Sequence, residues 1–313
     1  MQLWLPVVAG CVSPGFCAWG LFTWKDCWKH DALSLNAFKS SLASLLFAVL
    51  VVAMHRRPVA ADVVAWLALS SFLGIVVSDT LWLESLRLLG ARRMIAIDAS
   101  KPFVAAFFGY ALLGDRVAAL GYLGVVLTTV GIFLLNRERQ GAGDEEEDGD
   151  DEKTESTRGY ALAFANVLCD VYAATITVAK HGRLTSEETN LVRFGLASAA
   201  LLFFVGAKRH RSGRGAESSF DDLKAKGGDD AAMTTTQWRR VVFGVFLVTF
   251  LTPLVLTWTM FVLPLSVALT LSSLTPIWSL PVGLRHGEPI TRLAAAGAAL
   301  AVGGVACLAF AVT

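Results

Sequence analysis

Long apolar blocks dominate the sequence, and short polar segments separate them. Within a block the apolar residues are nearly continuous, and helices that are apolar on every side are typical of a lipid environment. A helix needs about 20 apolar residues to cross a bilayer. The pattern predicts ten such helices, at Leu3–Trp24, Ala37–Met54, Val63–Trp82, Met94–Leu113, Ala118–Asn136, Tyr160–Val178, Leu191–Ala207, Val241–Val262, Leu265–Leu284 and Leu293–Val312.

Two hydrophilic segments interrupt this series. Residues 137–158 include nine carboxylates and one lysine between Asp144 and Glu155. Like charges at this density repel and cannot bury apolar surface, so we predict a disordered linker there. A calcium-binding or regulatory role is the alternative. Residues 208–240 have mixed charge and are predicted to form a flexible loop. The acidic linker divides the chain into halves of five helices each, 1–136 and 159–313.

One two-helix unit occurs in both halves, at Lys101–Leu135 and Thr275–Leu308. Each unit has an apolar helix with a proline, a short turn with an acidic residue, and a helix with spaced glycines. The proline lies 13 or 12 residues before the acid, and the glycines lie 9 and 16 residues after it. This spacing indicates an internal repeat. Its members are Pro102, Asp115, Gly124 and Gly131 in the first unit and Pro276, Glu288, Gly297 and Gly304 in the second.

The number of helices in each half determines how the halves are oriented. Because five is odd, the second half must enter the membrane from the side opposite to the first. The predicted fold is therefore an all-α polytopic membrane protein with ten transmembrane helices in two inverted five-helix repeats. Secondary transporters share this arrangement and bind substrate near the midplane between the repeats.

The segment SDTLWLESLRLLGARRMIAIDASKPF (Ser78–Phe103), together with the "GD" and "GE" turns, resembles the EamA-like branch of the drug/metabolite transporter superfamily. The resemblance covers nearly all of the chain outside the two hydrophilic segments. It implies ten helices around a central cavity, with helices five and ten packed outside. The sequence departs from the family pattern at Asp115, where glutamate is usual, and at Lys101, where a neutral residue is common.

The glycines of each unit fall on one helix face and would let neighbouring backbones approach closely, so we predict a packing role for them. Composition excludes other classes of site. A formal net charge of +1 implies no nucleic-acid partner. The five cysteines form no CxxC pair and most lie in apolar blocks, so the sequence predicts no disulfide framework, metal site or cofactor.

Charged residues inside the predicted helices are the candidate functional groups, because each costs roughly 2.5–3.5 kcal/mol to insert. Asp98 and Lys101 are three residues apart in helix four and can pair on one face. Asp170 lies midway along helix six, where it is either protonated or meets Lys101 across the cavity. Asp79 lies near the end of helix three, either at the membrane interface or within the span. The Asp98–Lys101 pair has a purely structural alternative, as a self-neutralising ion pair.

Several uncharged residues complete the candidate site. Ser272 and Thr275 occupy the positions in the second repeat that correspond to Asp98 and Lys101. The charged pair is therefore not required by the fold itself. Trp19 and Trp278 are candidates for rigid cavity walls.

These features favour a secondary transporter for a small polar metabolite, with an amino-acid-like zwitterion as the preferred substrate. Lys101 would bind the anionic group, and Asp98 or Asp170 would receive the amine or a coupling proton. An organic-phosphate or nucleotide-sugar exchanger and a multidrug exporter are the alternatives within transport. A non-transporting receptor or scaffold and an intramembrane enzyme are alternatives outside it. The sequence contains no GxSG nucleophile motif and no histidine cluster, which disfavours an enzyme. It specifies neither the membrane nor the oligomeric state.

The distribution of basic residues predicts the orientation in the membrane. When every Lys and Arg except Lys101 is assigned to its nearest loop, the loops after odd-numbered helices hold 20 and the others hold 6. The positive-inside rule then places the odd-numbered loops in the cytosol and both termini outside. The family resemblance implies cytosolic termini instead.

Overall fold

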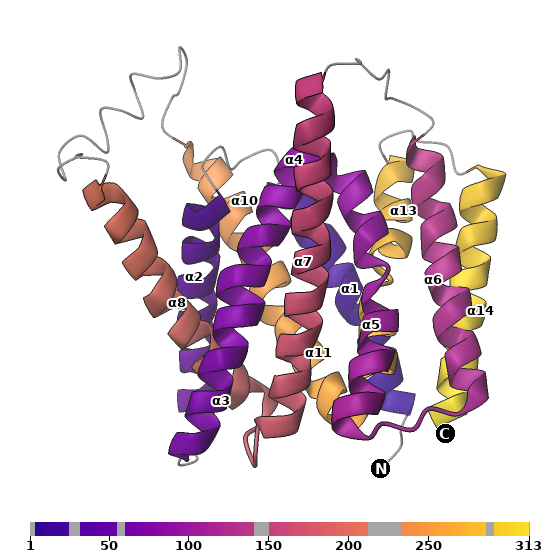
Figure 1. The fold of residues 1–313 in the computed structure, drawn as a ribbon, viewed down its shortest axis with the longest axis horizontal. Coiled ribbons are helices and arrows are strands. Elements are labelled where there is room, and N and C mark those ends of the chain that lie inside the picture. The colour runs from indigo at the N-terminus through magenta and orange to yellow at the C-terminus, as the bar shows by residue number, and fades with distance from the viewer. Residues whose placement is uncertain are drawn as a thin grey trace.

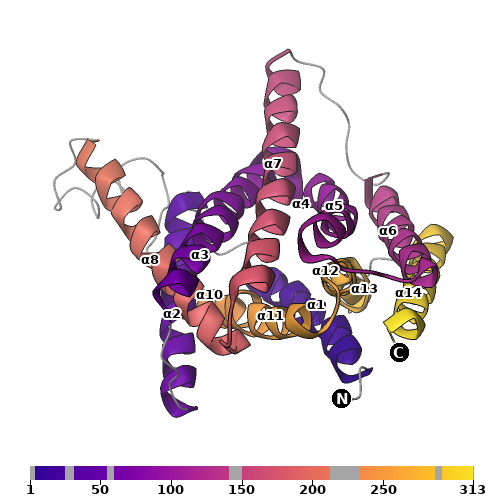
Figure 2. The same ribbon diagram turned by 60° about the horizontal axis from the view of Figure 1, so that its bottom comes forward.

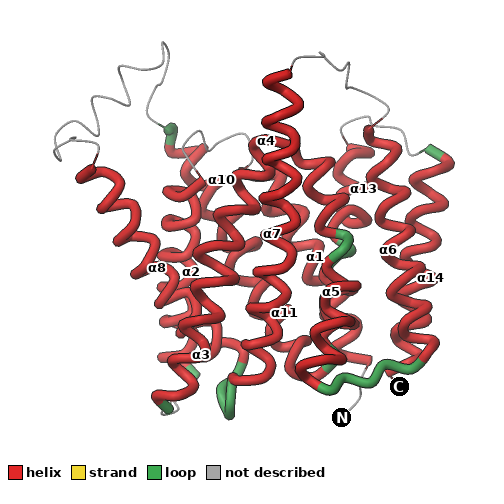
Figure 3. The backbone as a smooth tube through the Cα atoms, in the orientation of Figure 1, coloured by secondary structure: helices red, strands yellow, loops and turns green. Residues whose placement is uncertain are grey.

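The computed structural model describes residues 4–24, 32–54, 60–140, 150–211, 233–285 and 291–312, and every regular element in these ranges is helical (Figure 3). This confirms the all-α polytopic fold class. Seven helical stretches are long and apolar enough to cross a membrane, and three shorter stretches are also apolar: Lys101–Leu113, Ala119–Leu135 and Leu265–Pro281. The count of ten spans stays a prediction.

The two halves run through the molecule in opposite directions (Figure 1). The first half begins at the lower edge and ends with α6 at the upper edge, where α7 then begins, and α14 returns the chain to the lower edge. An inverted repeat requires this course. The first half contains α1 (Trp4–Trp24), α2 (Ala32–Ala53), α3 (Ala61–Ser71), α4 (Ser78–Asp98), α5 (Lys101–Phe108) and α6 (Ala119–Gln140). The second contains α7 (Asp150–Lys180), α8 (Ser186–Arg211), α10 (Thr235–Val245), α11 (Thr252–Val262), α12 (Leu265–Ser272), α13 (Thr275–Arg285) and α14 (Arg292–Val312).

Short π-helical segments join or extend these helices at three places. Phe72–Val77 joins α3 to α4, Phe246–Leu251 joins α10 to α11, and Gly109–Leu113 extends α5. The first two segments lie 174 positions apart, which is also the separation of Pro102 and Pro276. The repeat therefore extends beyond the two-helix unit to the third helix of each half. Such segments often occur at functional sites.

The passage between the third and fourth spans differs from the prediction. A loop was expected at residues 83–93, but helix α4 covers that stretch. A straight helix would separate Trp82 from Asp98 by about 24 Å, yet the Trp82 indole N–H donates to Asp98 Oδ2 at 2.8 Å. The chain therefore reverses direction between these residues, as two antiparallel spans require. The expected continuous helix Met94–Leu113 is wrong, because a turn at Ala99 and Ser100 divides it.

The ninth predicted helix, Leu265–Leu284, is divided in the same way at Ser273 and Leu274. The hydrophilic segments are also partly helical. Helix α6 continues to Gln140 and α7 begins at Asp150, so the segment 137–158 is helical at both ends, while 141–149 lie outside the described residues. Within 208–240, α8 continues to Arg211 and α10 begins at Thr235, and residues 212–232 lie outside the described residues.

Helices α6 and α14 pack against each other at one side of the bundle (Figures 1 and 2). The predicted glycines form this contact. A Cβ added to Gly124 would lie 2.7 Å from the Gly304 carbonyl oxygen, and one added to Gly297 would lie 2.7 Å from the Gly131 carbonyl oxygen. Only glycine permits so close an approach of two helix backbones. Helices five and ten of the repeat scheme therefore pack against each other.

The turn after α5 links the two halves. Gly114 has φ +71°, a left-handed conformation that glycine adopts without strain. The next residue, Asp115, accepts a hydrogen bond from the Leu265 backbone N–H at 2.8 Å and so caps the first turn of α12. Glu288, its predicted counterpart, lies outside the described residues.

Candidate functional site

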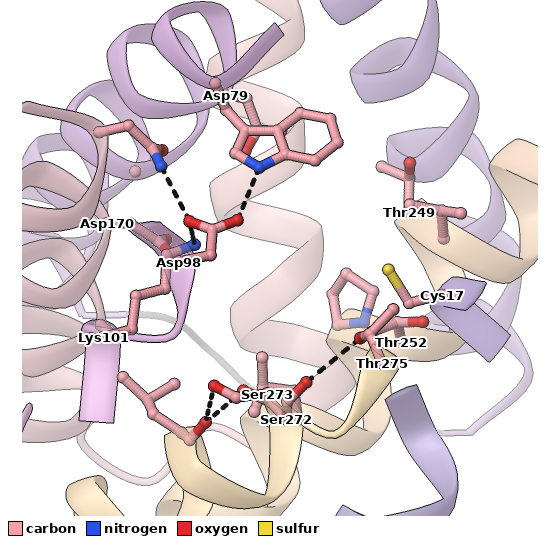
Figure 4. Close-up of a pocket in the computed structure, with 18 of the residues that line it drawn as sticks. Cys17, Asp79, Asp98, Lys101, Asp170, Thr249, Thr252, Ser272, Ser273 and Thr275 are labelled. Atoms are coloured by element: carbon pink, nitrogen blue, oxygen red, sulfur yellow. Dashed lines mark hydrogen bonds and ion pairs between the residues drawn. The ribbon is translucent and has the colours of Figure 1, made fainter. Parts of the chain in front are cut away.

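A central cavity of about 310 Å³ lies between the two halves (Figure 4). Residues of both halves line it, from α1, α2, α4, α5, α7, α8, α11, α12, α13 and two of the π-helical segments. Helix α6 contributes one residue, Ile132, and α14 contributes none, which agrees with an outer position for this pair. The charged and hydrogen-bonding side chains of the lining are Cys17, Lys39, Asp79, Trp82, Asp98, Lys101, Asn166, Asp170, Arg193, Thr249, Thr252, Thr257, Ser272, Ser273 and Thr275.

Three predicted residues form one ionic cluster in this cavity. Lys101 Nζ lies 3.1 Å from Asp98 Oδ1 and 2.9 Å from Asp170 Oδ2. Asp98 and Lys101 pair on one face, and Asp170 meets Lys101 from α7, one of the two arrangements that the sequence left open. One cation balances two carboxylates, so the Asp98–Lys101–Asp170 cluster has a formal charge of −1.

The two carboxylates of the cluster have different surroundings. Asp98 also accepts hydrogen bonds from the Trp82 indole at 2.8 Å and from the Asn166 amide at 3.3 Å. Asp170 has Lys101 as its one partner among the described residues, and its side chain is the most exposed of the three, at 37% against 23% for Asp98 and 19% for Lys101. Asp170 is therefore the carboxylate with unused acceptor capacity facing the cavity.

The local chain conformation explains why Asp98 and Lys101 reach the cavity. Helix α4 ends at Asp98 and α5 begins at Lys101, with Pro102 in the first turn of α5. Proline lacks an N–H and cannot continue the hydrogen-bond ladder of the preceding helix. The Ser100 hydroxyl donates to the Ile97 carbonyl oxygen at 2.7 Å and satisfies one acceptor at this helix end.

The second half breaks at the corresponding place. Helix α12 ends at Ser272 and α13 begins at Thr275, followed by Pro276. The Ser272 hydroxyl donates to the Leu269 carbonyl oxygen at 2.9 Å, and the Thr275 hydroxyl donates to the Ser272 carbonyl oxygen at 3.4 Å. Both residues line the cavity as predicted. The repeat thus places charged groups in one half opposite hydroxyl groups in the other.

A second ion pair lies in the cavity, between residues that sequence reasoning did not assign to it. Lys39 Nζ lies 3.3 Å from Asp79 Oδ2, and the Lys39 side chain is 6% exposed. Of the two positions considered for Asp79, the structure supports the one within the span, because this carboxylate lines the cavity.

Arg193 also lines the cavity and was likewise missed. Its Nε is buried and has no hydrogen-bond partner, and no carboxylate of the described residues lies within 4 Å of its guanidinium group. The basic-residue count assigned Lys39 and Arg193 to neighbouring loops, which is wrong because both lie within helices. A repeated sequence around them, described below, could have identified both residues.

The two predicted tryptophans do not line this cavity. Trp19 is 55% exposed on α1. Trp278 is 37% exposed, and its indole N–H donates to the Cys11 carbonyl oxygen at 2.7 Å, which links α13 to α1. The aromatic residues of the lining are Trp82 and Phe194 instead. Among the described residues, no group of three or more His, Cys, Asp and Glu side chains could hold a metal ion.

Comparisons with known proteins agree with this architecture. None of the curated proteins compared matches the chain. One solved crystal structure superposes with a TM-score of 0.69 over 97% of this chain and 94% of its own, at 16% sequence identity, which shows a shared fold. The family model described as the EamA-like transporter family matches residues 11–137 and 157–310, which covers most of each half. The chain is therefore a multi-pass integral membrane protein that belongs to the EamA-like transporter family.

Proposed function

We propose that this transporter moves a small zwitterionic metabolite of the amino-acid type by alternating access. The observation that supports this proposal is the Asp98–Lys101–Asp170 cluster, which brings a formal charge of −1 to a cavity shared by both halves. An ammonium group on the substrate complements that charge. Burial in a small cavity strengthens the attraction, because the effective dielectric constant there is lower than in water.

The three members of the cluster have different roles in this proposal. Asp98 is held by Lys101, Trp82 and Asn166, so it anchors the cluster. Lys101 offsets part of the charge of both carboxylates at a depth where an isolated carboxylate would be costly. Asp170, with its free acceptor capacity, receives the amine of the substrate. A coupling proton on Asp170 is the alternative use of the same carboxylate.

Alternating access requires the two halves to move relative to each other around the cavity. The breaks in α4–α5 and α12–α13 provide hinge points at the level of the ion cluster. The cap from Asp115 to α12 joins the halves at the lower edge of Figure 1, where α5 ends and α12 begins. Loss of this cap would accompany opening at that edge.

The charges in the cavity disfavour the rival substrates. An organic-phosphate or nucleotide-sugar exchanger needs surplus positive charge, whereas here Lys39, Lys101 and Arg193 face three aspartates. A multidrug exporter for lipophilic cations does not need the guanidinium group of Arg193 in its cavity. A receptor or scaffold would show no transport at all. An uptake assay therefore distinguishes it from a transporter.

Uptake by proteoliposomes tests the proposal. The purified protein would be reconstituted and supplied with each of the twenty standard amino acids, with glycerol phosphate and with a cationic dye. We expect saturable uptake of one or more amino acids, and loss of that uptake in Asp170→Asn. Asp62→Asn is the matched control, because Asp62 lies exposed in the first turn of α3. Uptake of glycerol phosphate or dye without any amino acid, or parental uptake by Asp170→Asn, would contradict the proposal.

A further inference from the structure

The second helix of each half contains the same sequence pattern, N-x-x-[K/R]-x-x-L-A-S. It reads NAFKSSLAS at residues 36–44 in α2 and NLVRFGLAS at residues 190–198 in α8. Each copy begins four residues after the start of its helix. Lys39 and Arg193 therefore occupy equivalent positions in the inverted repeat, one turn beyond the asparagine.

The two asparagines make contacts of the same kind. The Asn36 amide donates to the Ile75 carbonyl oxygen at 2.7 Å and to the Thr80 hydroxyl at 3.1 Å. The Asn190 amide donates to the Pro253 carbonyl oxygen at 3.1 Å and to the Thr257 hydroxyl at 3.1 Å. Each asparagine thus binds the second helix of its half to the third, and the cation one turn later faces the cavity.

The two helices bring their cations to the cavity from opposite edges of the molecule. In Figure 1, α2 begins at the upper edge and α8 begins at the lower edge. Each cation is seven residues from the start of its helix, a rise of about 10 Å. Helices α2 and α8 also pack against each other, with the Phe47 and Phe194 rings stacked at 5.7 Å. The repeat therefore supplies the cavity with one cation from each half.

The halves differ in the partner that they provide for this cation. In the first half Asp79, the residue before Thr80, pairs with Lys39 at 3.3 Å. In the second half the residue at the 174-residue spacing of the repeat is Pro253, which also lines the cavity. The whole stretch Thr235–Val262 contains no Asp or Glu. The second half thus presents a cation without the carboxylate that neutralises its counterpart.

The surroundings of Arg193 show that its binding capacity is unused. Its Nε is buried without a hydrogen-bond partner, and the buried Thr249 hydroxyl, another cavity-lining group of the second half, also lacks one. Asp170 and Asp79 also line the cavity, but neither lies within 4 Å of the guanidinium group. A buried guanidinium group without an anion is costly, and its planar donor fork matches a carboxylate.

We propose that Arg193 binds the carboxylate of the transported substrate, an assignment that rests on the function proposed above. Arg193, with a charge of +1, and the Asp98–Lys101–Asp170 cluster, with a charge of −1, then bind the two ends of one zwitterion. Lys101, which the sequence favours as the anion-binding group, is already held by two carboxylates. The second half therefore supplies the carboxylate site, and the ionic cluster supplies the amine site.

A comparison of an amino acid with its amide tests this assignment, because both compounds carry the amine and only the acid carries the carboxylate. Uptake of each would be measured in proteoliposomes for any amino acid that the parental protein transports. We expect Arg193→Gln to lower kcat/KM for the acid by about 10- to 100-fold, the loss expected for a charge-assisted hydrogen bond, and to bring the acid-to-amide ratio near one. Arg193→Lys keeps the charge without the fork and should retain a smaller preference for the acid.

The double variant Lys39→Gln/Asp79→Asn is the matched control, because it removes the equivalent cation together with its partner and should keep the parental acid-to-amide ratio. A parental ratio in Arg193→Gln would overturn the assignment while leaving the proposed function intact. If Arg193→Gln does not fold, an unchanged KM for the acid in Arg193→Lys would overturn it. A parental protein that transports neither acid nor amide would instead overturn the proposed function.

Discussion

Replacement of Lys101 by methionine is the most informative perturbation of the ionic cluster. The lysine contacts both carboxylates, at 3.1 Å for Asp98 and 2.9 Å for Asp170, so its loss leaves two negative charges without their cation. Replacement of Asp98 by asparagine is milder, because Lys101 keeps Asp170 and the asparagine oxygen can still accept from Trp82. The two single variants should therefore differ clearly in stability.

The magnitudes follow from burial. Removal of one partner of a buried ion pair costs about 3–5 kcal/mol. Because the Asp170 side chain is 37% exposed to the cavity, solvation offsets part of this cost. We expect Lys101→Met to lower the free energy of unfolding by about 2–4 kcal/mol and Asp98→Asn by about 1 kcal/mol. At about 2 °C per kcal/mol for a chain of this size, these losses correspond to roughly 4–8 °C and 2 °C in Tm.

The sequence alone suggests a two-member pair, for which the double variant would restore folding. Since Asp170 also contacts Lys101, the double variant still leaves one unpaired carboxylate. The triple variant Lys101→Met/Asp98→Asn/Asp170→Asn removes every charge of the cluster. It should recover most of the lost stability and should not transport.

Thermal unfolding of the purified variants in one detergent, followed by size-exclusion fluorescence, measures these differences, and proteoliposome uptake measures transport. Equal Tm values for Lys101→Met and Asp98→Asn would show that Lys101 does not stabilise both carboxylates. A triple variant that folds and transports at the parental rate would make the whole cluster structural.

Three further predictions concern the scaffold and access to the cavity. Asp115→Ala removes the cap on α12 and should cost about 0.5–2 kcal/mol in thermal unfolding, whereas Asp62→Ala, at a helix start where no side chain caps, should cost less. Gly304→Leu collides with the α6 backbone and should lower Tm, whereas Gly303→Leu has open space within 4 Å and should not, so equal Tm values would contradict the packing role. Cys17 lines the cavity, so N-ethylmaleimide should inhibit uptake by the parental protein and not by Cys17→Ser, and equal inhibition of both would contradict this placement.

The sequence was sufficient to predict the helical fold, the repeated two-helix unit and the Asp98–Lys101 pair. These features depend on hydrophobic length and on spacing along one helix, which a single sequence contains. The glycines of α6 and α14 were predictable for the same reason, since four small residues recur at matching distances from an acidic turn.

The remaining features depend on how each helix is rotated about its axis and on where it breaks. Lys39 and Arg193 lie at the third position of their predicted helices, so the sequence places them in helices but does not show which way they face. The hydrogen bonds of Asn36 and Asn190 turn that part of each helix inward. Trp19 is exposed, and the spacing of residues within α1 does not indicate which side of this helix faces the cavity. The turn at Ala99 and Ser100 lies between two apolar stretches, so Pro102 signals this break and the apolar pattern does not.

A structure of the protein with a transported amino acid bound is the decisive test of the proposed substrate site, because it shows which side chains hold each end of the substrate. We predict a substrate in the central cavity, with its amine within 4 Å of Asp170 and its carboxylate within 4 Å of the Arg193 guanidinium group. A substrate whose carboxylate contacts Lys101 and not Arg193, or one bound outside this cavity, would contradict it.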